Sequence, residues 1–169
     1  YVSRLLDGRW ETGRSIFQDT WQIGGCPVNG PAIAAYNGAV VVAWYTEANS
    51  TPLVRMIRSD DDGSSFGSPV TIDANSPVGR VDIDFLESGD AVVSWIGKND
   101  GDEGALLWRA ISNTGELGRL QKVTSISTRR NAGFPQMSRV GDVLLFAWTD
   151  TSTDASRIQT ARVPLHLRN

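Results

Sequence analysis

Alternating charges mark one short stretch of the chain as the first place to look for chemistry. Arg80, Asp82 and Asp84 are spaced two residues apart. In an extended strand this spacing places all three side chains on the same side. Because an unpaired charge is costly to bury, we expect either ion pairs within the trio or contacts from the trio to a ligand.

Asn29 and the pair Arg130 and Asn131 lie in segments that join one strand-rich unit to the next. Asn29 precedes a glycine, so ordinary turn formation is the alternative to ligand binding there. Arg130 follows another arginine, and such a pair suits either an anionic ligand or simple exposure to solvent. Cys26 lies near Asn29, but the single histidine, His166, is far along the chain, so we expect Cys26 to pack rather than to act as a nucleophile.

Carboxylates in the polar loops form the third candidate group, because a general acid is often a carboxylate. The candidates are Glu47, Asp100 and Asp150. Solvated loop charge is the alternative at each position, and it is the one that we expect. No cluster has the spacing of metal ligands, and one histidine argues against zinc, so we expect neither a metal nor a cofactor.

The elements that must position these residues recur along the chain. Trp44, Trp95 and Trp148 are 51 and 53 residues apart, and each ends an apolar run that follows a tight turn. Short runs rich in Val, Ile and Leu between turn residues are typical of strands, and no window keeps the apolar period of a helix. The sequence therefore predicts an all-β chain with a repeated hairpin, and we expect the three tryptophans to pack in its core.

The first repeat contains a turn that carries its own clamp. Ser59, Asp61, Gly63 and Phe66 fit the pattern Ser-x-Asp-x-Gly-x-x-aromatic. In this pattern Asp61 can accept hydrogen bonds from turn amides, Gly63 can take a positive φ, and Phe66 can turn back into the core. The turn resembles the Asp-box of the sialidase-like (BNR-repeat) β-propellers. That resemblance implies a structural role for these four residues, on the side of the fold away from the active face.

The resemblance and the repeat together predict a sialidase-like β-propeller in one domain, residues 1–169. The chain would hold about three four-stranded blades, at approximately 24–73, 75–127 and 129–163. Residues 1–23 would supply an outer strand or the end of a preceding blade. The alternative from the strand pattern alone is a β-sandwich, which also has short strands and frequent turns.

Three blades do not close a ring, because propellers have about four to eight and open sheet edges are a liability. We therefore expect that a second copy completes the ring in a homodimer or other homo-oligomer, or that the chain is a fragment of a longer propeller.

The resemblance implies a glycan as the ligand, and it leaves two functions open. The first is a scaffold that binds glycans or proteins, which is the function that we expect. The second is an exo-sialidase-like glycoside hydrolase whose site is completed outside this chain or by a second copy. Enzymes of the family use three arginines, a Tyr–Glu pair and an Asp acid/base, and no motif of this chain places a residue in that set.

Composition argues against other classes of partner. The 16 basic and 19 acidic residues give a net charge of −3 and form no basic run that would follow a phosphate backbone, so nucleic acid is not an expected partner. No apolar run approaches the roughly 20 residues that span a bilayer, so we expect no membrane insertion. A single cysteine leaves the compartment undecided, and only the resemblance implies secretion or the cell surface.

Overall fold

The structure is a computed structural model, and it describes residues 1–24, 28–98, 103–152 and 155–165. The strands are β1 (Leu5–Leu6), β2 (Arg9–Trp10), β3 (Ala32–Tyr36), β4 (Ala39–Thr46), β5 (Leu53–Ser59), β6 (Val70–Asp73), β7 (Gly79–Phe85), β8 (Ala91–Lys98), β9 (Glu103–Ile111), β10 (Gln121–Ser127), β11 (Gln136–Val140), β12 (Val143–Asp150) and β13 (Arg157–Pro164). Two single-turn 3-10 helices, η1 (Ala48–Ser50) and η2 (Arg130–Ala132), lie in loops. The prediction of an all-β chain is confirmed.

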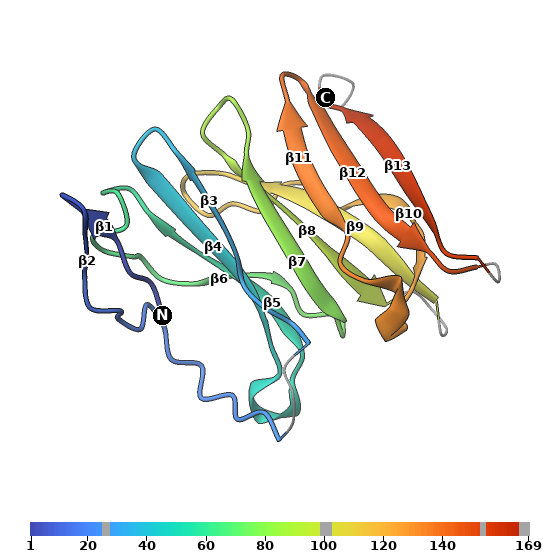
Figure 1. The fold of residues 1–169 in the computed structure, drawn as a ribbon, viewed down its shortest axis with the longest axis horizontal. Helices are drawn as coiled ribbons and strands as arrows, with labels where there is room; N and C mark the ends of the chain where they lie inside the picture. Colours follow the sequence, from blue (N-terminus) through green and yellow to red (C-terminus); the bar gives the residue numbers. More distant parts are fainter. Residues whose placement is uncertain (25–27, 99–102, 153–154, 166–169) are drawn as a thin grey trace.

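The strands form three larger sheets in which neighbours in sequence are neighbours in space. The first sheet has the order β3-β4-β5-β6, the second β7-β8-β9-β10, and the third β11-β12-β13. All pairs are antiparallel. A separate two-stranded hairpin, β1-β2, lies at the N-terminus. Figure 1 shows the three sheets following one another across the molecule, with β7 between β3 and β11.

Burial explains why the apolar runs are almost continuous. All residues of β8 except Lys98 are buried, because the second sheet is covered on both faces. In β12 of the third sheet, Leu144 and Phe146 are buried whereas Leu145 between them is 37% exposed. The alternation in β12 shows that only one face of the third sheet is covered by the described residues, and a half-covered sheet gives this period of two.

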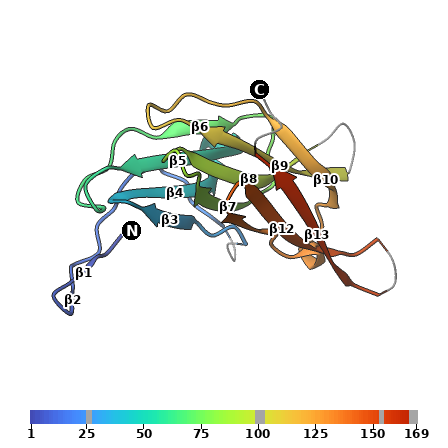
Figure 2. The same ribbon diagram turned by 90° about the horizontal axis from the view of Figure 1, so that it is seen from above.

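Two hydrophobic cores of described residues lie between the three sheets, one between each pair of neighbours. In the first core Val41 and Met56 of the first sheet pack with Phe85 and Trp95 of the second. In the second core Ile96 and Leu106 pack with Leu144 and Phe146 of the third sheet. Three sheets packed in succession, with β3, β7 and β11 side by side, are the arrangement of propeller blades, so the β-sandwich alternative is wrong. Figure 2 shows the same succession from above.

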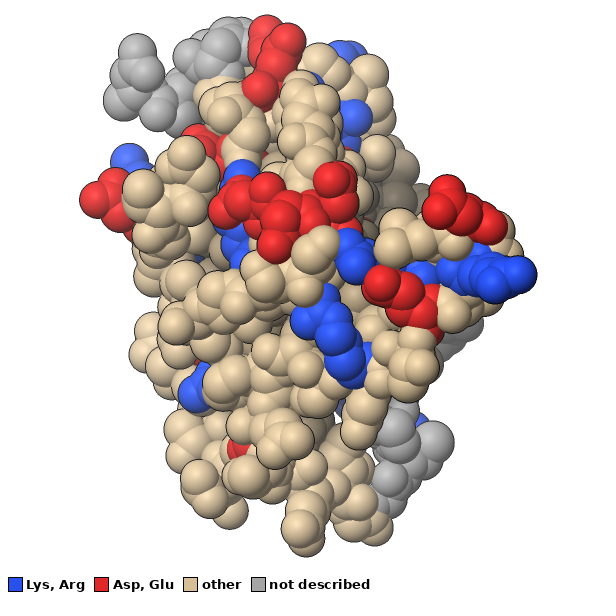
Figure 3. Space-filling view, turned by 90° about the vertical axis from the view of Figure 1, so that its left-hand side faces the viewer, with Lys and Arg blue, Asp and Glu red and all other residues tan. Residues whose placement is uncertain are grey.

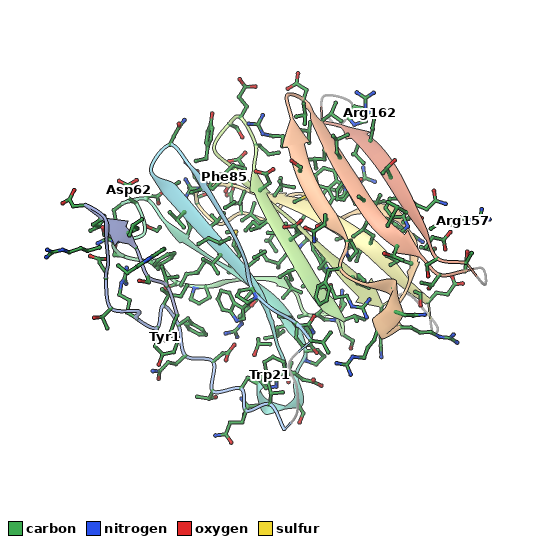
Figure 4. The ribbon with its side chains drawn as sticks, in the orientation of Figure 1. Tyr1, Trp21, Asp62, Phe85, Arg157 and Arg162 are labelled. Atoms are coloured by element: carbon green, nitrogen blue, oxygen red, sulfur yellow. The ribbon has the colours of Figure 1, made fainter. Side chains whose placement is uncertain are left out.

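The three sheets end together at two opposite sides of the molecule, and these two ends differ in structure. The turns between β3 and β4, β7 and β8, and β11 and β12 lie at one end, together with Asp62, and we call it the turn end (Figures 1 and 4). Helices η1 and η2, together with Trp21, lie at the opposite end, which we call the loop end. Asn37 and Gly38 both have positive φ, 49° and 81°, as a two-residue hairpin turn requires.

The clamp of residues 59–66 has the predicted hydrogen bonds. Ser59 Oγ donates to Asp61 Oδ1 (2.7 Å) and accepts from the Gly63 N–H (2.9 Å), and the Ser65 N–H donates to Asp61 Oδ1 (2.8 Å). Gly63 has φ +76°. Hydrogen bonds from Ser65 and then Ser59 lower the pKa of Asp61 to about 2. Phe66 is half-buried under the Arg14 guanidinium, 5.8 Å from Cζ to the ring centroid, rather than in either core.

Residues 1–23 run along the face of the first sheet that is remote from the second sheet (Figure 1). The Phe17 ring lies 5.9 Å from the Trp44 ring, and the Trp21 ring lies 5.5 Å from the Tyr45 ring. Within the described residues the third sheet has three strands and no partner from this segment. The N-terminal segment therefore covers the first sheet, where a preceding blade of a propeller would pack.

Candidate functional site

The crossing from the first sheet to the second, at the loop end, is fastened by Asn29. Its Oδ1 accepts from the Arg80 N–H (2.8 Å), and its Nδ2 donates to the Val78 carbonyl (3.1 Å). Gly79 has φ +94°, and a Cβ there would lie 2.7 Å from Asn29 Oδ1, so this approach requires glycine. Asn29 thus determines how β7 begins.

Arg80 is buried in an unusual conformation. Its φ is +55°, in the region that a residue with a side chain rarely adopts, and the pairing of β7 with β8 is irregular between Gly79 and Asp82. The residue is 4% exposed, and its Nη2 donates to the carbonyls of Thr128 (3.0 Å) and Arg129 (2.8 Å). Strained backbone of this kind persists only where surrounding contacts fix it.

The charge of Arg80 has no acidic partner within the described residues. Its Nη1 is buried and donates no hydrogen bond there, and no ion pair joins it to Asp82 or Asp84. The Phe134 ring lies 6.0 Å from Cζ. Burial lowers the pKa of the guanidinium, although it stays protonated at any physiological pH. The site therefore holds a cation with one unused donor, which can bind an anionic or carbonyl oxygen.

Asp82 and Asp84 fasten β11 of the third sheet to β7 of the second. Asp82 Oδ2 accepts from the Met137 N–H (2.6 Å), and Asp84 Oδ2 accepts from the Arg139 N–H (2.8 Å). The two Oδ1 atoms accept from the N–H groups of the residues that follow each Asp, at 2.9 and 2.8 Å. Burial raises the pKa of the Asp82 carboxyl. All four carboxylate oxygens thus accept a backbone N–H, and the expected ion pairs do not form.

The remaining candidates lie farther out at the loop end. Arg130 and Asn131 are exposed in η2. Glu47 is exposed and accepts from Tyr45 Oη (3.3 Å), and burial and then Glu47 raise the pKa of Tyr45 to about 12. Asp150 Oδ1 accepts from the Ser152 N–H (2.9 Å), which lowers the pKa of Asp150. Asp100 lies outside the described residues, as do Cys26 and His166.

Cavities lined by the described residues open at the loop end between neighbouring layers. One of about 940 Å³ lies between β10 of the second sheet and the β12–β13 side of the third, and Asp150 lines it. Another, of about 520 Å³, lies between residues 20–24 and η1, and Glu47 lines it. Figure 3 views the side of the N-terminal segment, where most charged side chains lie toward the turn end and the surface toward the loop end is largely uncharged.

The structure therefore brings together only part of the set of sequence-predicted residues. Asn29, Arg80, Asp82 and Asp84 form one group beside the inner strands, and Glu47 and Asp150 belong to separate cavities. Sequence reasoning missed Trp148, which lines the larger cavity. The repeat position of Trp148 indicated core packing only, and no sequence signal separated it from Trp95.

Solved structures share this arrangement of sheets over most of the chain. A Hadza microbial sialidase, Hz136, superposes with a TM-score of 0.59 at 22% identity over 94% of this chain and 37% of its own. A xylan β-1,4-xylosidase from Bacillus halodurans C-125 gives 0.59 at 10% identity over 92% of this chain and 33% of its own. The fold is part of a β-propeller.

A third similar structure is a GH43B protein from a Bacteroides ovatus xyloglucan locus, with a TM-score of 0.51 at 17% identity over 79% of this chain and 26% of its own. The chain thus spans about a quarter to two fifths of these structures. At such identities the likeness concerns the fold. No family model matches the chain, and no curated protein matches its sequence.

Among the described residues, no group of three or more His, Cys, Asp or Glu side chains is arranged to hold a metal ion. No helix within the described ranges is long and apolar enough to cross a membrane.

Proposed function

We propose that this chain is part of a sialidase-like Asp-box propeller that binds glycans or proteins without cleaving them. The observation that carries the proposal is the use of Asp82 and Asp84. Hydrolysis of the sialidase type, which uses a Tyr nucleophile in place of a second carboxylate, still needs an Asp that faces the substrate and can donate a proton. Here the inner carboxylates accept backbone N–H groups and hold two strands together. The clamp of Ser59 and Asp61 supports the Asp-box assignment.

Arg80 supports the second candidate, a sialidase-like glycoside hydrolase completed outside this chain. Its buried Nη1 lacks an acceptor in the described residues, and a substrate carboxylate would supply one. In this reading, the remaining arginines, the nucleophile and the acid would come from a second copy or from other parts of a longer chain. The chain's coverage of 37% or less of the three structures leaves room for them.

We further propose that the ring is completed beside the third sheet. Its outward face exposes Val140, Leu145 and Ile158, at 61%, 37% and 71%. Sheet faces of this kind are covered by the next blade in a propeller. A second copy of this chain or a further segment would cover it. Light scattering distinguishes the cases, and a well-folded monomer of about 18 kDa, the mass of one chain, would exclude the homo-oligomer.

One experiment separates binding from hydrolysis. The protein is incubated with a fluorogenic sialoside and, in parallel, applied to immobilised sialylated and neutral glycans. The scaffold proposal expects retention of a glycan without turnover. Turnover that Arg80→Ala abolishes would instead establish the hydrolase. Arg119→Ala, at an exposed residue of the loop between β9 and β10, is the matched control, and melting curves of both variants identify a loss caused by unfolding.

A further inference from the structure

At one position of its outer strand, the first sheet presents a carboxylate to the second sheet. At the equivalent position of its own outer strand, the second sheet presents a different residue to the third. In the first sheet Asp73 pairs with Val54, one bulged residue after the pair Thr71 and Arg55. In the second sheet Thr124 pairs with Leu106, after a matching bulge. The neighbouring strands agree, because Trp44 pairs with Arg55 and Trp95 with Leu107, next to these positions. Thr124 therefore stands where Asp73 stands.

The carboxylate at this position binds the tryptophan of the following sheet. Asp73 Oδ2 accepts from Trp95 Nε1 at 2.6 Å. Asp19 of the N-terminal segment accepts from Trp44 Nε1 in the same way, at 3.0 Å. Each of these hydrogen bonds joins an indole to the sheet or segment that precedes it in the chain. We call the pair of Trp and Asp a latch.

The third latch is absent from the described residues. Thr124 Oγ1 donates to the Ser125 carbonyl (3.2 Å), and the Trp148 indole N–H has no acceptor in the described ranges. The cavity of about 940 Å³ opens at this place. Its lining includes Trp148, Thr124 and Gln159 together with Glu103, Asp150 and Arg129. The missing carboxylate and the cavity thus coincide.

The lining has the chemistry of a sugar site. An indole offers a flat apolar face and one donor, while hydroxyl, amide and carboxylate groups match the hydroxyls of a pyranose. Its volume lies within the range of about 300–1,000 Å³ that is usual for ligand pockets. Two carboxylates against one arginine disfavour an anionic ligand.

We propose that this cavity binds a neutral pyranose of a glycan, with Trp148 as the aromatic contact. The proposal rests on the glycan-binding function above and names its site and ligand class. It places the neutral sugar at the outer part of the loop end. Arg80 does not line the cavity itself, but its Nη2 donates to the carbonyls of two lining residues, Thr128 and Arg129.

The test follows the indole N–H signals of the whole chain by NMR while xylotetraose or lactose is added. Trp148→Phe assigns the Trp148 signal by its loss. The proposal expects that a neutral saccharide shifts this signal. Thr124→Asp restores the latch carboxylate and should weaken binding about tenfold or more, because the carboxylate then occupies the indole N–H. Gln121→Asp, which adds a carboxylate to the same strand outside the cavity lining, should bind as the natural chain does.

The outcomes distinguish this proposal from the proposed function. Binding of any glycan that leaves the Trp148 signal in place, or that persists unchanged in Thr124→Asp, overturns the cavity assignment and preserves the glycan-binding function. Absence of binding to every neutral and sialylated glycan overturns both. A melting temperature of Thr124→Asp at or above that of the natural chain shows that lost binding is not lost folding.

Discussion

The two junctions between the three sheets are built from the same materials and close in different ways. At the first junction Trp95 is fully buried and bonded to Asp73, and Arg109 donates to the Ile72 carbonyl (3.1 Å). At the second junction Leu144 and Phe146 are equally buried, but Trp148 borders a cavity. Apolar packing is therefore common to both, and the junctions differ in the polar residue at the outer strand and in whether the loop end is filled.

The inner strands carry polar ties at both junctions. Across the second junction, Asp82 and Asp84 bond directly to the backbone of β11. Across the first junction β3 itself makes an apolar contact, with the Tyr36 ring 5.9 Å from the Phe85 ring, and the polar tie to β7 comes from Asn29 just before β3. The first junction is thus tied both near the axis and outside, whereas the second is tied near the axis and borders the cavity outside.

The largest expected effect comes from removing the two indoles in turn. Trp95→Ala should cost about 3–5 kcal/mol of unfolding free energy, because it empties a filled core. Trp148→Ala should cost close to the roughly 1 kcal/mol of an average substitution, because this indole already borders a cavity. Urea unfolding of both variants measures the difference. Equal losses would show that the junctions are packed alike.

Converting the first junction into the second should have an intermediate effect. Asp73→Thr removes the acceptor of Trp95 and leaves a buried indole N–H unsatisfied, which costs roughly 1–3 kcal/mol. Asp73→Asn keeps a side-chain oxygen and should lose less. Chemical denaturation measures the unfolding free energy of both variants. An unchanged midpoint for Asp73→Thr would show that the latch does not stabilise the fold.

The smallest effect concerns a turn that belongs to neither junction. The pKa of Asp61 is lowered to about 2 in the folded chain from an ordinary value of 3.8. A lowered carboxyl pKa stabilises the folded state above the unfolded pKa, and this contribution is lost as the pH falls toward 2. The melting temperature of the natural chain should therefore exceed that of Asp61→Asn by a few degrees at neutral pH and approach it below pH 4.

Two observations would sharpen or contradict this acid effect. Ser65→Ala removes one of the donors to Asp61, so it should reduce the pH dependence of the difference. A gap between the natural chain and Asp61→Asn that stays constant down to pH 2 would mean that Asp61 gains nothing from its ionised form. Binding to glycans should be unchanged in both variants, because the turn lies at the end opposite the cavities.

The sequence by itself determined the strands, the turns and the clamp. The runs after Asn37-Gly38 and Gly141-Asp142 are strands in the structure, and Ser59, Asp61 and Gly63 bond as their spacing predicts. Such features depend on residues close together in the chain, so local preference and the period of two are enough to specify them. The separate group of Arg80, Asp82 and Asp84 was found by the same means.

Only the tertiary structure decided what those side chains bind. Asp82 meets a backbone N–H 55 residues away, and Trp95 meets a carboxylate 22 residues before it in another sheet. Bulges in β6 and β10 determine that Asp73 and Thr124 occupy matching positions, and the sequence carries no sign of such a register shift. Contacts between sheets depend on how complete blades stack, and this stacking made one repeated tryptophan a core residue and another the wall of a cavity.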